Sequence, residues 1–525
     1  MASFVSSLSP VPAFPEYQGP YKVGTVDVEI PVSELESPSS VPDGSSHIHT
    51  ILFRIFYPAV PESQGKRVSW LPAPQRLHIA AYAHHTHGLL SESSFLPRHL
   101  HWTSIPAHKN ATLLPPPSDR PTARWPTMLF SHGLGGNRNA YSHLAGSLAS
   151  HGVVVVCPEH RDGSAALTLV RDPQSRAPQT TQHAVPYLRI AHTQTPDAWS
   201  ARTKQLRVRL WELGLLFEAL TALDRGAATT PSSQPKLINL TTAPPSALAQ
   251  FAHALDIHTP GRVLFAGHSF GAATIRHRAP GGGRGGESVV VAGGAGGAGG
   301  GVARVFQVDG AFACEGEDFV AKAGGEGGGH WGGVSEGWKS GWGGGGRMGR
   351  RVGRGARGPG ARPHFFYVES SAHLSQSDFG VLFPWLTKRV FKSDNPERVL
   401  RLNVRAVLQF LRENGVPVAG TGRAALVDGG HPGMKGEWTE KDGIILERCK
   451  EGEEKVDAWK WIDVVGLGAK AGPSELEIRE KGKEEREVKA EEGEKEMQGE
   501  IEPSLESVAE GAAVHATKEL VGTEK

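Results

Sequence analysis

The chain has 525 residues, enough for one or two domains, and its 56 Lys and Arg nearly balance its 55 Asp and Glu. The formal net charge of +1 argues against nucleic acid as the main partner, because a polyanion is bound by a strongly basic surface. Glycine (66) and proline (37) make up about a fifth of the chain, too little for a wholly disordered protein, so their excess must be local.

The N-terminal part predicts a surface arm followed by two strands. Residues 1–20 are rich in Ser and Pro, which favours a flexible arm. Residues 21–30 (YKVGTVDVEI) show the partial alternation of a half-buried strand, and residues 49–57 (HTILFRIFY) repeat it. We expect these two segments to pair as the antiparallel entry to a sheet.

A loop-rich stretch then gives way to a β-α-β pattern. Residues 58–125 predict loops and one helix, near residues 77–82. Residues 127–130 (TMLF) and 152–158 (GVVVVCP) are the short, continuous apolar runs typical of strands buried on both faces. Residues 140–150, which lie between them, have the apolar spacing of a helix.

A long helix and a third buried strand extend this pattern. In residues 197–223, leucine and phenylalanine recur at steps of four and three, which predicts an amphipathic helix. Residues 247–255 predict a short helix, and residues 263–266 (VLFA) a third buried strand. The alternation of strands and helices predicts the α/β class, with a mostly parallel central sheet and helices on both faces.

Two glycine-rich segments interrupt the pattern. Of the 66 glycines, 32 lie in residues 281–360, and such runs form sheets or helices only at a high entropic cost. Between the runs, residues 303–308 (ARVFQV) predict one strand. We interpret residues 277–302 and 324–361 as low-complexity insertions, which are either lineage-specific or translated from non-coding sequence.

The motif G-x-S-x-G at Gly267-His268-Ser269-Phe270-Gly271 directly follows the strand VLFA. A nucleophilic serine in this motif stands on a strained strand-to-helix turn, and the small residues on either side let the backbone close. We interpret Ser269 as a nucleophile, and the alternative is a plain strand-loop-helix turn.

A serine is a weak nucleophile, so it needs a general base and an acid that orients the base. In folds with this serine turn the chain order is Ser, acid, His, so both partners should follow residue 269. Asp309 ends the strand at 303–308 and is our candidate acid, although it could also be a turn residue. The competing carboxylates are Glu315, Glu317 and Asp318.

The candidate base is His373, which follows the strand-like residues 365–369 (FFYVE) on a loop of small residues. His364 precedes that strand and His330 lies among glycines, so both fit the role less well. The alternative interpretation of His373 is a structural surface histidine.

An acyl-transfer enzyme must also bind the oxyanion with preorganised N–H groups. One donor is the amide after the nucleophile, on Phe270. The second is expected on a loop after an early strand, and residues 131–136 (SHGLGG) form such a loop. The rival interpretation, a phosphate-binding loop, is weak because neither GxxxxGK[ST] nor GxGxxG spacing is present.

Three longer segments together resemble the platelet-activating factor acetylhydrolase family of α/β-hydrolases, in its intracellular form. They are residues 130–165, 265–274 and 372–379 (AHLSQSDF), and residues 20–35 and 54–59 also look like that family. The resemblance implies an α/β-hydrolase fold and a calcium-independent serine esterase. The implied substrate is a glycerophospholipid with a short or oxidised sn-2 acyl group. The enzyme could bind this phospholipid at a lipid–water interface.

By this resemblance, Ser269, Asp309 and His373 form the catalytic triad, and the amides of Leu134 and Phe270 form the oxyanion hole. The chain departs from the family pattern after the nucleophile, because Pro280 and three glycines end the helix early. Two other functions remain open. One is a general carboxylesterase or polyester hydrolase of the same fold, and the other is a degenerate, non-catalytic hydrolase scaffold.

We expect the catalytic domain to span residues 21–415. Residues 416–465 then form a C-terminal extension, and residues 466–525 a charged tail that is too poor in apolar residues to fold. The three cysteines are widely spaced, which fits a reducing compartment. The N-terminus lacks the basic segment and apolar run of a signal peptide, and no run of about 20 apolar residues is present. These features predict a cytoplasmic protein without a transmembrane segment. No metal-binding motif is present, so we expect no metal and no cofactor.

Overall fold

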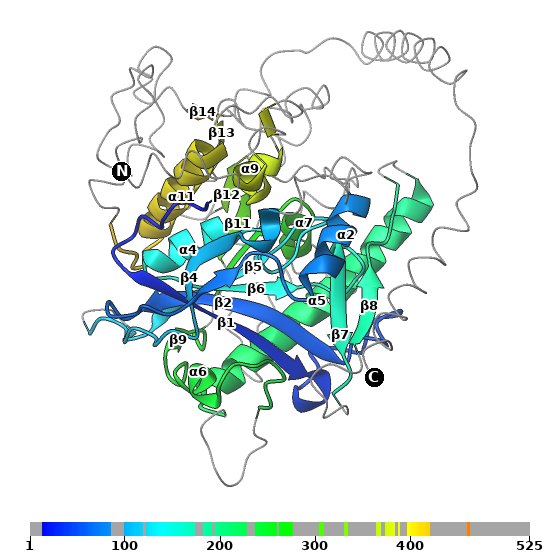
Figure 1. The fold of residues 1–525 in the computed structure, drawn as a ribbon, viewed down its shortest axis with the longest axis horizontal. Coiled ribbons are helices and arrows are strands. Elements are labelled where there is room, and N and C mark those ends of the chain that lie inside the picture. The colour runs from blue at the N-terminus through cyan, green and yellow to red at the C-terminus, as the bar shows by residue number, and fades with distance from the viewer. Residues whose placement is uncertain are drawn as a thin grey trace, which may run out of the picture.

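A computed structural model gives the fold of the chain (Figure 1). The structure describes residues 13–85, 99–118, 122–173, 182–191, 195–227, 237–259, 262–276, 304–308, 330–333, 364–368, 373–383, 387–388, 396–420 and 459–461. The expected insertion at 277–302 and the expected tail at 466–525 lie outside the described residues, as does most of the expected arm.

The helices and strands follow the order of the sequence analysis closely. The strands are β1 (Lys22–Pro31), β2 (Thr50–Ala59), β3 (Arg67–Ser69), β4 (Ser104–Lys109), β5 (Trp125–Ser131), β6 (Val154–Glu159), β7 (Leu167–Arg171), β8 (Gln182–Pro186), β9 (Leu255–Asp256), β10 (Leu264–His268), β11 (Arg304–Val308), β12 (His330–Gly333), β13 (His364–Val368) and β14 (Trp459–Trp461). The helices are α2 (Gln75–His85), α4 (Ser142–Ser150), α5 (Pro196–Asp224), α6 (Pro245–Ala249), α7 (Phe270–Arg276), α9 (Phe379–Leu382) and α11 (Pro396–Glu413), with short 3-10 helices η1 (Val32–Glu34), η2 (His99–His101) and η4 (His373–Gln376).

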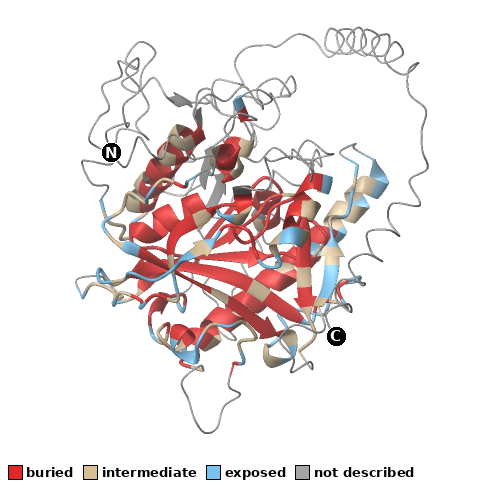
Figure 2. Cartoon of the chain, in the orientation of Figure 1, coloured by how far each residue is buried: buried red, intermediate tan, exposed pale blue. Residues whose placement is uncertain are grey.

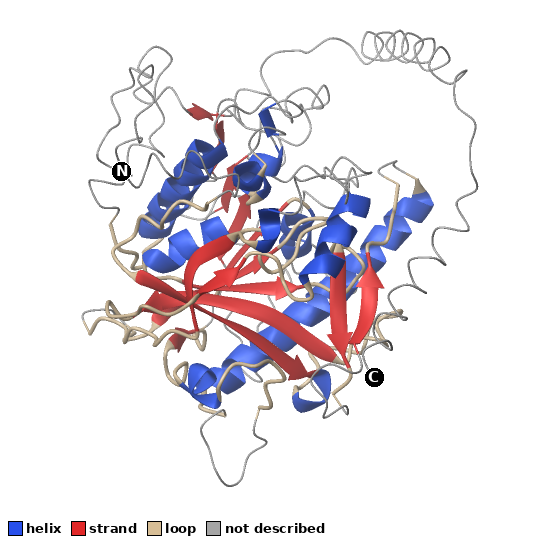
Figure 3. Ribbon diagram, viewed as in Figure 1, coloured by secondary structure: helices blue, strands red, loops and turns tan. Residues whose placement is uncertain are grey.

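One large sheet organises the described residues (Figure 3). Its strand order is β14-β13-β12-β11-β10-β5-β6-β2-β1-β4-β3, and β9 pairs with the start of β5. The central strands from β6 through β5, β10, β11 and β12 to β13 are all parallel to their neighbours. The expected mostly parallel sheet of an α/β-hydrolase fold is therefore confirmed.

The antiparallel pairing of the first two strands is also confirmed. Lys22 lies opposite Ala59 and Pro31 opposite Thr50, with no shift in register between them. The burial of β1 differs from the half-buried strand that we expected, because nearly all of its residues are buried. The reason is that β1 lies inside the sheet, between β2 and β4, and both faces of the sheet are covered.

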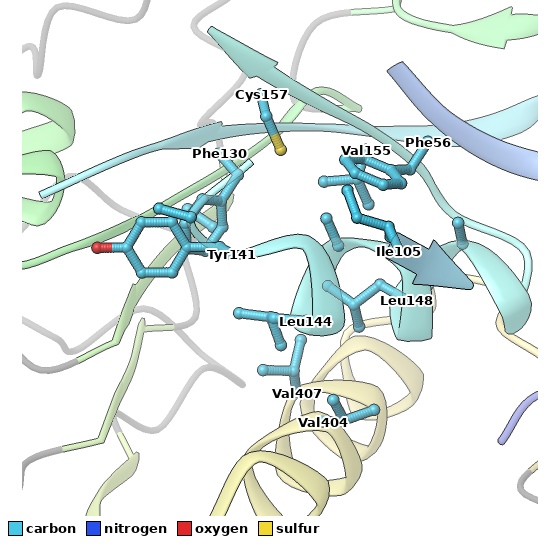
Figure 4. Packing of buried hydrophobic residues seen from close by; sticks show 14 of the residues in the cluster. Phe56, Ile105, Phe130, Tyr141, Leu144, Leu148, Val155, Cys157, Val404 and Val407 are labelled. Atoms are coloured by element: carbon cyan, nitrogen blue, oxygen red, sulfur yellow. The ribbon is translucent and has the colours of Figure 1, made fainter. Parts of the chain in front are cut away.

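Helices cover both faces of the sheet and bury a separate apolar core on each (Figure 2). Met128 belongs to one core and its neighbour Leu129 to the other, as successive side chains of a strand point to opposite faces. The first core includes residues of α2, α4 and α11, and Figure 4 shows Leu144 and Leu148 of α4 beside Val404 and Val407 of α11. The second core is covered by α5 and α6.

The long helix α5 matches the predicted range to within a residue at each end. It begins after Thr195, whose hydroxyl accepts a hydrogen bond from the amide of Ala198. Gly214 inside the helix is unfavourable for helix formation, but packing explains it. A Cβ at this position would lie 2.4 Å from Cγ of Pro38, so only glycine lets the loop of Pro38 pack this closely on the helix.

Several elements were not predicted. Strands β3 and β4 come from a segment that we had assigned to loops and one helix, and the residues of the β7–β8 hairpin had no assignment. Strand β12 lies inside the Gly-rich residues 324–361, and β14, from the expected extension, pairs with β13. Backbone hydrogen bonds to neighbouring strands form these elements, and local composition does not report such bonds. In the part of the chain that is described, no helix is long and apolar enough to cross a membrane.

Candidate active site

Ser269 stands alone between β10 and α7, on the sharp turn that the sequence motif predicts. Its φ is 55°, in the left-handed region that favours glycine. The flanking glycines make the turn possible, because a Cβ at Gly267 would lie 2.5 Å from the backbone of Gly271. A Cβ at Gly271 would lie 2.0 Å from the carbonyl oxygen of Ser131. This is the geometry of a strained nucleophile turn.

The loop that follows β5 lies directly against this turn. A Cβ at Gly133 would lie 3.0 Å from Cβ of Ser269, so the backbone of the loop approaches the serine closely. The side chain of Leu134 packs against the small apolar cluster that contains Phe270. The residues whose amides we expect to bind an oxyanion are therefore neighbours in the structure.

The amides of residues 133–136 differ in their hydrogen bonds. The Gly133 amide donates to the Tyr141 hydroxyl at 3.1 Å, and the Gly135 amide donates to the Ser164 carbonyl oxygen at 2.7 Å. The Gly136 amide donates within the loop, to the carbonyl oxygen of Gly133 at 3.2 Å. The Leu134 amide is different, because no described residue accepts a hydrogen bond from it. The same holds for the Phe270 amide among the described residues, so both N–H groups are suited to a ligand.

Tyr141 links the loop to the strand that carries the nucleophile. Its hydroxyl accepts the hydrogen bond of the Gly133 amide and lies 2.7 Å from Nδ1 of His268. The hydroxyl therefore joins the loop amide to the ring of the residue that precedes the nucleophile candidate. We had assigned Tyr141 only to the apolar spacing of a helix, and its polar role was missed.

Arg209 of α5 is a second residue that the sequence analysis missed. Its guanidinium is fully buried and donates to Asp162 at 3.0 Å and to the carbonyl oxygen of His132 at 2.7 Å. It also lies 3.3 Å from the hydroxyl of Thr274 and 4.6 Å from the ring centroid of Phe270. Arg209 therefore joins the loop after β5 to the helix after the nucleophile. A charged residue between the apolar positions of α5 was the available signal.

A buried histidine and glutamate lie behind the same loop. His160 is 2.8 Å from the Ser131 hydroxyl through Nε2 and 2.8 Å from Glu212 through Nδ1. Burial, reinforced by Asp162, raises the pKa of Glu212 to about 8. Burial, reinforced by Arg209, holds the pKa of His160 well below its usual value, so this imidazole is neutral at pH 7.

The candidate acid, Asp309, lies outside the described residues, but the strand before it is described. Strand β11 runs parallel to β10, and Val308 lies opposite His268 in the register. Ser269 is the next residue after His268, and Asp309 is the next residue after Val308, so both follow residues that are opposite each other in the sheet. The alternative acids Glu315, Glu317 and Asp318 also lie outside the described residues.

The candidate base, His373, is the first residue of η4, which follows β13, and its side chain is outside the description. The next residues of this segment are well anchored by Asp378. Its buried carboxylate accepts hydrogen bonds from the Ser142 amide and hydroxyl at 2.8 and 2.5 Å, from the His143 amide at 3.0 Å and from Nε1 of Trp70 at 2.9 Å. Asp378 therefore caps the N-terminus of α4 and ties the histidine segment to it.

No group of three or more His, Cys, Asp or Glu side chains in the described ranges is arranged to hold a metal ion. The structure brings Ser269, Leu134 and Phe270 together. Their catalytic roles, like those of Asp309 and His373, stay predictions.

Comparison with known proteins gives matches over about half of the chain. The family model described as platelet-activating factor acetylhydrolase, isoform II, matches residues 7–279, which include Ser269 and end before Asp309 and His373. A putative phospholipase A2 from Schizosaccharomyces pombe is 29% identical over 263 residues, covering 50% of this chain and 57% of that protein. Platelet-activating factor acetylhydrolase from Cavia porcellus is 28% identical over 265 residues, covering 50% and 51%.

The chain thus spans about half the length of these relatives. Among solved structures, a ferulic acid esterase from Streptomyces cinnamoneus overlaps with a TM-score of 0.44 at 16% identity, covering 86% of this chain and 99% of that one. This overlap is too low to bear on activity.

Proposed function

This chain belongs to the platelet-activating factor acetylhydrolase family, isoform II, and we propose that it is a serine esterase that removes a short or oxidised sn-2 acyl group from glycerophospholipids. The observation that carries the proposal is the strained turn at Ser269, which stands beside two amides without a described acceptor, on Leu134 and Phe270. This is the arrangement that acyl transfer from an ester requires.

In this proposal Oγ of Ser269 attacks the ester carbonyl carbon while its proton passes to the imidazole of His373. The carbonyl oxygen becomes an oxyanion and is bound by the Leu134 and Phe270 amides. The tetrahedral intermediate collapses, and the lysophospholipid leaves as an alcohol that takes the proton from the imidazole. A water molecule, deprotonated by the same imidazole, then hydrolyses the acyl-enzyme. Asp309 holds the imidazole in the productive tautomer.

Labelling with a fluorophosphonate tests the nucleophile. Wild-type protein should be labelled covalently and should hydrolyse ester, and Ser269→Ala should do neither while keeping its melting temperature. Ser246→Ala, which changes a serine of α6, is the matched control and should behave as wild type. Labelling that persists in Ser269→Ala places the nucleophile elsewhere and refutes the proposal.

Two substrates, both assayed in excess EDTA, test the acyl donor. A phosphatidylcholine with a short sn-2 chain should be turned over with a higher kcat/KM than p-nitrophenyl acetate, because the proposed substrate is a phospholipid. Chelation should change neither rate, as this mechanism generates its nucleophile without a metal. A clear preference for the soluble ester supports a general carboxylesterase of the same fold instead.

A further inference from the structure

The buried contacts behind the loop of residues 131–136 form a chain of hydrogen bonds that ends at the candidate oxyanion site. Ser131 is the last residue of β5, His160 follows β6, and Glu212 lies in the middle of α5. All three side chains are buried, and each adjacent pair in the chain is 2.8 Å apart. The order Ser-His-Glu resembles that of a catalytic triad, so its role needs a separate argument.

Ser131 does not have the position of a nucleophile. It is fully buried, and it ends a strand in ordinary extended backbone, without the positive φ that marks Ser269. Its carbonyl oxygen packs against Gly271, where a Cβ would lie only 2.0 Å from that oxygen. An ester therefore has no approach to this hydroxyl.

The hydrogen bonds run from Glu212 through both ring nitrogens of His160 to Ser131. One oxygen of Glu212 accepts from the Arg161 amide at 2.9 Å, and the other lies 2.8 Å from Nδ1 of His160. Nε2 of the same ring lies 2.8 Å from the Ser131 hydroxyl, whose oxygen in turn lies 3.4 Å from the Arg209 guanidinium. Each group in the chain fixes the orientation of the next one.

This series of hydrogen bonds reaches the loop of residues 131–136 at Ser131, the first residue of the loop. Ser131 precedes Leu134 by three residues, and its backbone is held from the other side by the contact with Gly271. The next carbonyl, on His132, accepts a hydrogen bond from Arg209 at 2.7 Å. These buried polar contacts hold the two residues that begin the loop of Leu134.

We propose that Glu212 is a positioning residue for the oxyanion hole, which acts through His160 and Ser131 to hold the Leu134 amide at bonding distance from the oxyanion on Ser269. The inference rests on the proposed function, because it needs an acyl-transfer reaction at Ser269. A displacement of about 1 Å in an active site lowers rates by up to about 10²-fold, and loss of one oxyanion donor lowers kcat by about 10²–10³-fold.

Glu212→Leu tests this role, because leucine has a similar size but makes no hydrogen bond. It neither donates to nor accepts from Nδ1 of His160, so the ring loses the group that orients it toward Ser131. We expect kcat to fall about 10-fold or more, at a KM within about twofold of the wild-type value, since the change affects the transition state rather than substrate binding.

A matched pair of inhibitors separates oxyanion binding from general damage. A trifluoromethyl ketone analogue of the substrate adds to Ser269 and forms an oxyanion, whereas the corresponding carbinol binds without one. Glu212→Leu should weaken the ketone by about 10-fold or more and the carbinol by less than about twofold. Ser131→Ala, which removes only the hydroxyl at the end of this hydrogen-bond chain, should show the same selective loss and serves if Glu212→Leu does not fold.

Asp224→Asn is the control, because Asp224 is another buried carboxylate of α5. It accepts from the Leu255 amide at 2.7 Å and from His258 at 2.6 Å, at the far end of the helix. This variant should lose stability but bind ketone and carbinol in the wild-type ratio. Equal weakening of both inhibitors by Glu212→Leu and Ser131→Ala, or no weakening, overturns the positioning role. A wild-type protein that is not labelled at Ser269 refutes the proposed function instead.

Discussion

At the scale of single residues, the candidate site depends on a strained backbone at Ser269 and on close backbone contacts at the two flanking glycines. A serine at φ of 55° costs about 1–3 kcal/mol and persists only where its surroundings enforce it. Gly267 and Gly271 make this turn possible, because a Cβ at either position would clash with nearby backbone atoms. The two glycines of the motif are thus explained by contacts with α7 and with the end of β5.

The triad assignments can be tested by substituting the two residues for which no side chain is described. His373→Ala should lower kcat by about 10³-fold or more, because a base and its nucleophile act as one unit. Asp309→Asn should lower kcat less, though by orders of magnitude, since the acid mainly sets the tautomer of the base. Steady-state kinetics on the short-chain phospholipid measures both effects.

Asp318→Asn is the control for the acid, because Asp318 is the competing aspartate. It should retain wild-type kcat. Near-normal activity of Asp309→Asn together with a crippled Asp318→Asn would assign the acid to Asp318.

At the scale of elements, Asp378 joins the segment of the candidate base to the helix that follows the oxyanion loop. Four donors from α4 and Trp70 converge on its carboxylate. Burial nevertheless outweighs these donors and raises the pKa of Asp378 to about 6. The carboxyl therefore binds protons more tightly in the folded chain than in the unfolded chain.

This shift predicts a pH dependence of stability. Between pH 4 and 6 the folded state holds more protons on Asp378 than the unfolded state, so its contribution to the free energy of unfolding falls as pH rises through that window. Asp378→Asn lacks this titration. The difference in unfolding free energy between wild type and Asp378→Asn should therefore fall by about 2 kcal/mol from pH 4 to pH 7.

Urea denaturation of both proteins across this range measures the difference, in which other titrating groups cancel. Ser377→Ala is the neighbouring control, because its hydroxyl bonds only to the Leu374 carbonyl among the contacts described for it, and its difference from wild type should be independent of pH. A flat or rising difference for Asp378→Asn contradicts the prediction.

At the scale of the whole molecule, the sheet extends beyond the expected catalytic domain. The expected boundary at residue 415 excludes β14, yet Trp461 lies opposite Phe366 and Trp459 opposite Val368 at the edge of the sheet. Strand β13 leads to η4, which begins with His373. We propose that residues 459–461 belong structurally to the hydrolase sheet, whereas residues 466–525 are an independent tail.

Two truncations separate these parts of the chain. Removal of residues 466–525 should leave kcat/KM and the melting temperature nearly unchanged, because the tail has too few apolar residues to offset about 1–2 kcal/mol of ordering per residue. Removal of everything after residue 458 also deletes β14 and should lower the melting temperature by several degrees. Calorimetry and esterase assays check both, and a large loss in the 1–465 protein would show that the tail packs on the core.

The sequence by itself determined the parts of this protein that depend on local pattern. Continuous apolar runs gave β5, β6 and β10, the spacing of α5 gave its length, and G-x-S-x-G between strand and helix gave Ser269. Only the tertiary structure decided what lies around that serine. Arg209, Glu212 and Asp378 are distant from Ser269 in sequence, and their roles arise from hydrogen bonds between separate elements, which no local pattern encodes. Strands β12 and β14 were missed for the same reason, since neighbouring strands supply the pairing that their own residues do not signal.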